Sequence, residues 1–266
     1  MAFANDAPLC AQPHGLDASP PLTSMLRGSS DRLSGMKTLG IVGGIAPEST
    51  IDYYRRIIAL YRERTRDGSY PPIVITSIDM KRMLDLIDAG KLPEVTEYLL
   101  IEILRLAKAG ADVGMLASNT PHLVFDDLRR RSPIPLVSIV EAACDAARSL
   151  GIGRVGLFGT RFTMQARFYP EVFAKHGIAV VVPNAVEQDD IHDRYMSELV
   201  QGVYRAETRG RLLEILDRLK ERENIEGLIL GGTELPLLFR NEPETEIPLL
   251  NTTELHAQRV IDAVFA

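Results

Sequence analysis

The sequence lacks a long apolar run, an excess of basic residues and all but two cysteines. No apolar run approaches the roughly 20 residues of a membrane-spanning helix, so we expect no membrane association. The formal net charge of −6 argues against nucleic acid as a partner, because phosphate binding needs a concentrated basic surface. The N-terminus has no basic segment followed by an apolar core, so we expect no secretory signal.

The two cysteines, Cys10 and Cys144, carry no local pattern that indicates reactivity. Cys10 falls in an irregular N-terminal stretch and Cys144 in a helix-like run, so we expect no structural disulfide between them. This fits a reducing, cytoplasmic environment. No cluster of His, Cys and Asp has metal-ligand spacing, and the sequence therefore predicts no metal site.

The chain has 266 residues, 45% of them hydrophobic and 25% charged, enough for one large α/β domain or two small ones. Residues 1–35 contain scattered proline, serine and glycine without a period, and we interpret them as an extension. Strand, turn and helix patterns then alternate from Met36 to the end, which is typical of parallel α/β sheets. Predicted strands lie at residues 39–42, 73–77, 111–115, 134–139, 155–158, 178–182, 227–230 and 247–251. Residues 187–190 are predicted to form a polar loop, with two helices over 191–220.

An internal duplication indicates two pseudo-symmetric lobes, each a mostly parallel sheet flanked by helices. Four pairs of landmarks recur in the same order at nearly constant spacing: Gly43 with Gly159, Ser118 with Gly232, Ile134 with Ile247, and Glu141 with Glu254. We assign residues 36–138 and 251–266 to the first lobe and 139–250 to the second.

Four turns rich in glycine and hydroxyl groups follow predicted strands, at residues 43–49, 118–122, 159–163 and 232–234. Ligands of parallel sheets bind beyond the carboxyl ends of the strands, and free backbone N–H groups there suit a carboxylate. The turns are therefore predicted to face each other around a small ligand; the alternative is that they are only packed turns. The first does not follow the G-x-G-x-x-G dinucleotide pattern, which argues against a nucleotide.

Five motifs in fixed order resemble the aspartate/glutamate racemase family, and together they span most of residues 36–266. They are GIVGG…PEST, ASNTPH, GTRFTM, GGTEL and TTELHA. The resemblance implies an active site between two lobes, a homodimer, and a pyridoxal-phosphate-independent isomerase without a cofactor. It implies α-proton transfer on a small amino acid such as aspartate or glutamate, with one thiol on each face of the α-carbon.

Both thiol positions of the family are replaced in this chain. The family has cysteine, or in some members threonine, where this chain has Ser118, and cysteine where it has Gly232. In some relatives a lysine for the second substrate carboxylate falls in the segment that here is 187–190, which is acidic. We therefore predict an atypical thiol-free site. Other carbanion chemistry, such as a decarboxylase or lyase, and a non-catalytic amino-acid-binding protein remain open alternatives.

The candidate catalytic residues are Ser118, His122, Thr233 and Glu234. His122 and also His256 could replace a missing thiol, since a histidine pKa lies near neutrality; the alternative is a structural hydrogen bond within a helix. Glu234 orients the site or caps its helix. The resemblance places Asn119, Thr120, Thr160, Thr163 and Thr233 in carboxylate-binding turns, and it aligns Arg82 with an arginine that pairs with the substrate carboxylate in relatives. The candidate substrate-binding residues are Gly44, Ile45, Arg82, Asn119, Thr120, Thr160, Arg161, Thr163, Gly232 and Thr233. For the hydroxyl residues the alternative is helix capping, and for Arg82 an ordinary surface position.

Overall fold

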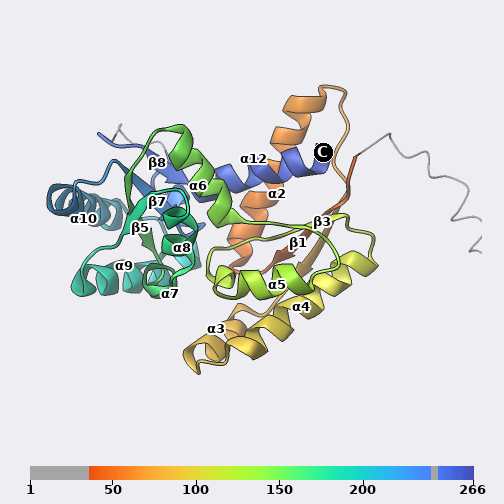
Figure 1. Ribbon diagram of the computed structural model, residues 1–266, viewed down its shortest axis with the longest axis horizontal. Helices are drawn as coiled ribbons and strands as arrows, with labels where there is room; N and C mark the ends of the chain where they lie inside the picture. The colour runs from red at the N-terminus through yellow and green to blue at the C-terminus, as the bar shows by residue number, and fades with distance from the viewer. Residues whose placement is uncertain (1–35, 241–244) are drawn as a thin grey trace, which may run out of the picture. The chain divides into compact units, whose positions relative to one another are not determined.

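A computed structural model describes residues 36–240 and 245–266 (Figure 1). The predicted extension, 1–35, lies outside the described residues. Two four-stranded parallel sheets carry the fold, and the strand orders are β2-β1-β3-β4 and β6-β5-β7-β8. The second order repeats the first, and the predicted fold of two similar parallel α/β lobes is confirmed. No helix in the described part of the chain is long and apolar enough to cross a membrane.

The first sheet and its connections run from β1 to β4. The elements are β1 (Leu39–Gly43), α2 (Pro47–Thr65), β2 (Ile73–Ser77), α3 (Met80–Asp88), α4 (Leu92–Lys108), β3 (Val113–Leu116), the 3-10 helix η1 (Thr120–Val124), α5 (Phe125–Arg131) and β4 (Leu136–Val137). We call this sheet with the helices that cover it lobe 1.

The second sheet and its connections follow. The elements are α6 (Ile139–Ser149), β5 (Arg154–Gly159), α7 (Arg161–Gln165), α8 (Phe168–Ala174), β6 (Ala179–Val181), α9 (Ala185–Ser197), the 3-10 helix η2 (Leu199–Gln201), α10 (Ala206–Glu223), β7 (Gly227–Gly231), α11 (Leu235–Leu238), β8 (Leu249–Asn251) and α12 (Thr252–Phe265). We call this sheet with the helices that cover it lobe 2.

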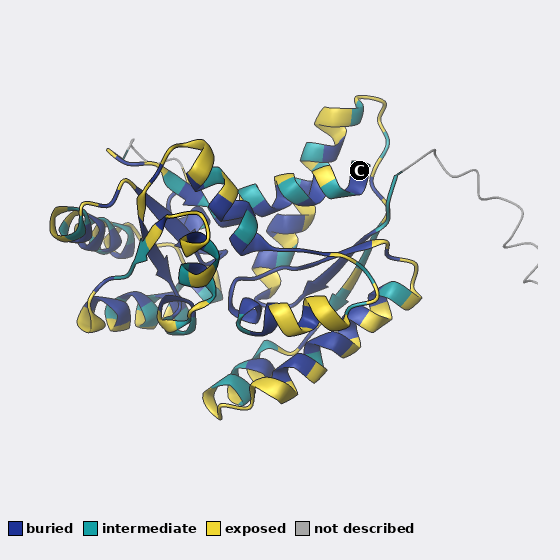
Figure 2. Cartoon of the chain, in the orientation of Figure 1, coloured by how far each residue is buried: buried dark blue, intermediate teal, exposed yellow. Residues whose placement is uncertain are grey.

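The strands are short, continuous apolar runs because helices cover both faces of each sheet. The residues of β1 and β3 are buried throughout, as the dark strands of Figure 2 show. In lobe 1, Ile41 and Met115 pack with α2 and α12, while Val42 and Leu116 pack with α3, α4 and α5. In lobe 2, the corresponding layers are α6 with α8 and α9 with α10.

Two helices cross from the sheet they follow to the other lobe. Helix α6 follows β4 of lobe 1, yet its buried residues pack with β5, β7 and α8 of lobe 2. Helix α12 follows β8 of lobe 2, yet it packs with β1, β3 and α2 of lobe 1, and Figure 1 shows it beside α2. The chain therefore passes between the lobes twice.

The register of the sheets supports the pairing of Ser118 with Gly232. Gly159 pairs with Gly231 across β5 and β7. In lobe 1, Val42 pairs with Leu116, so that the next residue, Ala117, stands where Gly231 stands in lobe 2. Ser118 and Gly232 are then equivalent residues just beyond the carboxyl ends of β3 and β7.

The prediction of a polar loop at residues 187–190 is wrong, because these residues form the first turns of α9. The Asn184 side chain accepts a hydrogen bond from the Glu187 N–H at 3.0 Å, and the Glu187 carboxylate accepts one from the Asn184 N–H at 3.1 Å. This reciprocal capping box starts the helix. Glu187 also accepts a bond from Arg218 at 2.9 Å, so its charge is neutralised within the fold.

Candidate functional site

The turns that follow β1, β3, β5 and β7 converge on one small cavity between the lobes. Helices α3 and α9 close it from opposite sides. The lining residues are Ile45, Ala46, Met80, Met83, Leu84, Ser118, Thr120, Thr160, Phe162, Tyr195, Met196, Val200 and Glu234. The predicted convergence of these turns is thus present in the structure, together with five of the predicted site residues: Ile45, Ser118, Thr120, Thr160 and Glu234.

The cavity measures about 30 Å³, which is room for only one or two water molecules. A free amino acid is much larger than this volume. A ligand of that size could bind only if the residues that line the cavity move apart.

Two hydroxyl groups enter the cavity from lobe 1. Ser118 and Thr120 are buried, and within residues 36–240 and 245–266 neither hydroxyl has a hydrogen-bond partner. Thr120 begins the 3-10 helix η1, so backbone N–H groups at this turn lie beside the hydroxyls. Ser118 and Thr120 keep 8% and 6% of their surface exposed, and their hydroxyls are available to a carboxylate.

A buried cluster of hydroxyls surrounds Glu234 and joins the two lobes. Ser49 of α2 donates to Glu234 Oε1 at 2.5 Å, and Thr233 donates to Oε2 at 3.0 Å. Tyr195 of α9 also donates to Oε2. The Ser49 and Thr233 hydroxyls lie 2.6 Å apart. Ser49 comes from lobe 1 and the other three residues from lobe 2, so the cluster holds the lobes together beside the cavity.

Tyr195 fills the space that a side chain at position 232 would need. A β-carbon added to Gly232 would lie 2.5 Å from Tyr195 Cε2 and 2.6 Å from Tyr195 Oη. Burial, followed by the nearby Glu234 charge, raises the pKa of the Tyr195 phenol well above its usual value. The sequence analysis missed both Tyr195 and Ser49. The available signal was Gly232 itself, since a missing side chain in a packed site leaves room for another.

Asn119 and Thr163 lie behind the cavity wall. Asn119 accepts a hydrogen bond from Tyr169 at 2.6 Å and donates to Thr252 at 3.3 Å, which uses both ends of its amide. Thr163 is fully buried, and its hydroxyl lies 3.2 Å from that of Thr160. These two predicted substrate-binding residues support the turns instead of lining the cavity.

Both candidate histidines make structural hydrogen bonds. His122 Nε2 accepts from the Ile139 N–H at 3.2 Å, so its Nδ1 carries the proton and donates to the Ser118 carbonyl at 3.2 Å. His256 Nε2 donates to the Val137 carbonyl at 3.0 Å, and its Nδ1 accepts from Tyr53 at 2.9 Å. Burial lowers the pKa of His122 to about 3 and that of His256 to about 4. Both rings are neutral and occupied, which favours the structural alternative.

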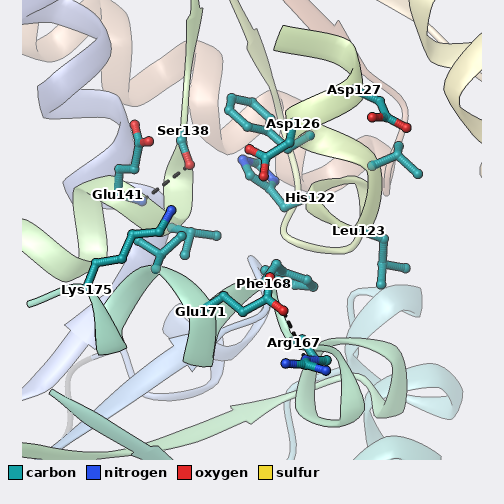
Figure 3. Close-up of a pocket in the computed structure, with 14 residues that line it drawn as sticks. His122, Leu123, Asp126, Asp127, Ser138, Glu141, Arg167, Phe168, Glu171 and Lys175 are labelled. Atoms are coloured by element: carbon teal, nitrogen blue, oxygen red, sulfur yellow. Dashed lines mark hydrogen bonds and ion pairs between the residues drawn. The ribbon is translucent and has the colours of Figure 1, made fainter. Parts of the chain in front are cut away.

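His122 faces a second cavity, of about 240 Å³, which Figure 3 shows in close-up. It lies where η1, α5, α6 and α8 meet. Acidic groups such as Glu141 and basic groups such as Lys175 both line it, and Arg167 pairs with Glu171 at its edge. The cavity has no single charge sign, and none of the hydroxyl residues of the Glu234 cluster lines it.

The two predicted arginines do not line the inter-lobe cavity. The exposed Arg82 guanidinium lies 4.6 Å from the centre of the Tyr98 ring, on the outer side of α3. Arg161 pairs with Asp189 at 2.9 Å. Gly44 has a φ of +86° and supports the first turn through its backbone. The lining thus contains no basic side chain among the described residues, and these residues contain no group of three or more possible metal ligands.

Comparisons with known proteins agree with this geometry. A family model described as Asp/Glu/Hydantoin racemase matches residues 42–260. The structure of PH1733, an aspartate racemase homologue from Pyrococcus horikoshii OT3, is 34% identical, with a TM-score of 0.75 over 87% of this chain and 100% of that one. The aspartate racemase of Picrophilus torridus is 20% identical, with a TM-score of 0.67 over 86% and 94% of the two chains, and shows the shared fold. The broad specificity amino-acid racemase RacX of Bacillus subtilis is 22% identical over 86% of this chain and 98% of its own length.

Proposed function

Because the chain belongs to the Asp/Glu/Hydantoin racemase family, we propose that it is a pyridoxal-phosphate-independent amino acid racemase or epimerase with a thiol-free site. The observation that carries the proposal is the inter-lobe cavity, where turns of both lobes bring free hydroxyls and a hydrogen-bonded carboxylate together. Such a site can hold an amino acid and exchange the proton on its α-carbon.

The α-carboxylate of the substrate is assigned to the Ser118 and Thr120 hydroxyls. When the α-proton leaves, negative charge moves onto this carboxylate, and donors fixed there stabilise it in the transition state. Closure of the lobes around the substrate strengthens the effect, because a water-excluded site screens charge less.

The side chain of the substrate faces apolar surface. Met80, Met83, Leu84 and Met196 line the cavity, and among the described residues the acidic group in the lining is Glu234. A second substrate carboxylate would meet no cation there and would be repelled by Glu234. We therefore expect amino acids with uncharged side chains to react faster than aspartate or glutamate, although the family resemblance gives the latter two. The B. subtilis relative is named a broad specificity amino-acid racemase, which is consistent with a range of substrates wider than aspartate and glutamate.

The test is α-proton exchange in deuterium oxide. Pure protein is incubated separately with the L and D forms of alanine, leucine, methionine, aspartate and glutamate, and the α-proton signal is followed by NMR. Exchange with inversion supports a racemase. No exchange with any of these amino acids, together with saturable binding by calorimetry, would replace the racemase by a binding protein.

A second candidate function rests on the asymmetry of the cavity. Its titratable lining groups, Tyr195 and Glu234, both belong to lobe 2, and among the described residues no base contacts the Ser118 hydroxyl on the other side. One-sided proton transfer suits a decarboxylase or lyase acting on a small carboxylate, since the carbanion then needs a proton from one face only. Exchange with retention in the same assay favours this function over racemisation.

A further inference from the structure

We propose that Tyr195 is the proton-transfer residue on the lobe 2 face of the cavity and that Glu234 accepts the proton of its phenol. This inference rests on the proposed function, because it assumes that the α-proton of a bound amino acid is exchanged. It holds for racemisation and for one-sided chemistry alike, since both need a proton carrier on at least one face.

Position is the first argument. Ser118 and Gly232 occupy equivalent places beyond β3 and β7, and Ser118 from lobe 1 and Tyr195 from lobe 2 both line the cavity. On the Gly232 side the space for a side chain is taken by the Tyr195 ring, whose Cε2, Oη and Cζ atoms all lie within 2.8 Å of a β-carbon built there. The phenol lines the cavity at the position that a side chain on residue 232 would occupy.

The count of protons in the Glu234 cluster is the second argument. Four contacts join Ser49, Tyr195, Thr233 and Glu234, and the three hydroxyl groups supply only three protons. A fourth proton can be held on Glu234 in two ways: on Oε2 it keeps the contact with Tyr195, and on Oε1 it is donated to Ser49, which then donates to Thr233. The cluster can thus take up and release one proton without losing a hydrogen bond.

The transfer step follows from these contacts. The Cα–H bond of the substrate breaks and its proton forms an O–H bond on Tyr195 Oη. The proton that Tyr195 donated moves to Glu234 Oε2, and the electron pair of the broken bond stays on the substrate and spreads into its carboxylate. The reverse transfer protonates the carbanion from the same face.

The relay through Glu234 is needed because a buried phenol does not ionise readily. Burial raises the pKa of Tyr195 well above the usual value for tyrosine, so a free phenolate is not available near neutral pH. A phenol that gives its own proton to a carboxylate while it receives another remains neutral throughout. Glu234, which contacts the phenol directly, fits this role.

The experiment compares deuterium exchange of the separate L and D enantiomers by wild-type protein, Tyr195→Phe and Glu234→Gln. Phenylalanine keeps the ring that packs over Gly232, and glutamine keeps acceptor and donor groups in the cluster. For the enantiomer that presents its α-proton to lobe 2, we expect each variant to exchange about 10²- to 10⁴-fold more slowly, the usual contribution of a general acid–base group. Any exchange of the other enantiomer should stay within a few-fold of wild type.

Tyr61→Phe is the matched control, because Tyr61 is a similarly buried tyrosine whose hydroxyl accepts a hydrogen bond from Ser69 at 3.3 Å, away from the cavity lining. Circular dichroism and urea unfolding establish that each variant is folded. A selective loss for one enantiomer supports the relay, because general damage to the fold would slow both enantiomers wherever both exchange. Wild-type rates in folded Tyr195→Phe overturn the inference while leaving the proposed function intact. Absence of exchange by the wild-type protein overturns both.

Discussion

Replacement of Gly232 by alanine tests the packing on which the inter-lobe site depends. The new β-carbon would lie 2.5 Å from Cε2, 2.6 Å from Oη and 2.8 Å from Cζ of Tyr195. Ordinary contacts between carbon atoms are about 3.5–4.0 Å, so the ring must move by about 1 Å. The backbone of Gly232 is not in the left-handed region, and the effect of the substitution is therefore steric.

The expected cost has two parts. Overpacking of a core site costs about 1–3 kcal/mol, and loss of the hydrogen bond from Tyr195 to Glu234 costs about 1.5–3 kcal/mol, since it is made to a charged group. We expect Gly232→Ala to lower the free energy of unfolding by about 2.5–6 kcal/mol and to slow α-proton exchange. Urea unfolding measures the first effect and NMR the second.

Two matched variants separate this contact from general effects of alanine. Gly210 lies within α10 with no atom within 4 Å of an added β-carbon, so Gly210→Ala should stabilise the protein by about 0.5–1 kcal/mol. In a Tyr195→Ala background, Gly232→Ala should cost less than about 1 kcal/mol, because residues in contact are not additive. Equal costs of Gly232→Ala in both backgrounds would refute the reasoning.

Two other predictions follow from the site and the buried histidines. Because the pKa values of His122 and His256 fall to about 3 and about 4, from an ordinary 6.5, the unfolded chain binds protons before the folded one does. Their stabilisation is complete above pH 6.5 and is lost as the pH falls toward 3–4; at pH 5 the loss is about 2 kcal/mol for each histidine. Urea unfolding at pH 7.5 and 5 checks this, and equal stabilities would contradict it. The double variant Ser118→Cys, Gly232→Cys should gain little two-thiol racemisation of aspartate or glutamate, because Tyr195 occupies the space of the second thiol. Adding Tyr195→Ala makes room for that thiol and should raise the rate in a polarimetric assay; equal rates of the double and triple variants would contradict this.

The two lobes could be predicted because buried parallel strands leave a clear residue pattern in the sequence. A buried strand covered on both faces needs continuous apolar residues, and the turn beyond it needs small or hydroxyl residues, as at Val42-Gly43 and Leu230-Gly231. Both features repeat along the chain, so the order of the sheets could be predicted. The helix at 187–190 was missed although its start has the spacing of a capping box, Asn184 followed three residues later by Glu187.

The site was only partly predictable, because its contacts join residues that are distant in the chain. Tyr195 lies in a helix with the pattern of an ordinary amphipathic segment. No motif near it in the sequence indicates that it contacts Gly232. Ser49 meets Glu234 only after the lobes are assembled. Arg82 shows the opposite error, since the family resemblance suggested that it contacts the substrate, yet in α3 its exposed guanidinium lies over the Tyr98 ring.

The double crossing joins the two lobes by two chain segments beside the cavity. The first segment runs through Ser138 and the second through Thr252. Two histidines hold the first segment in place by hydrogen bonds to the residues on either side of Ser138. His256 donates to the Val137 carbonyl, and His122 accepts from the Ile139 N–H. Two connections restrict the movement of one lobe against the other more than a single connection would. Lobe 1 is not a continuous piece of sequence, because α12 from the end of the chain completes its core, and a fragment ending at Ser138 would have to bind that helix before its core was complete.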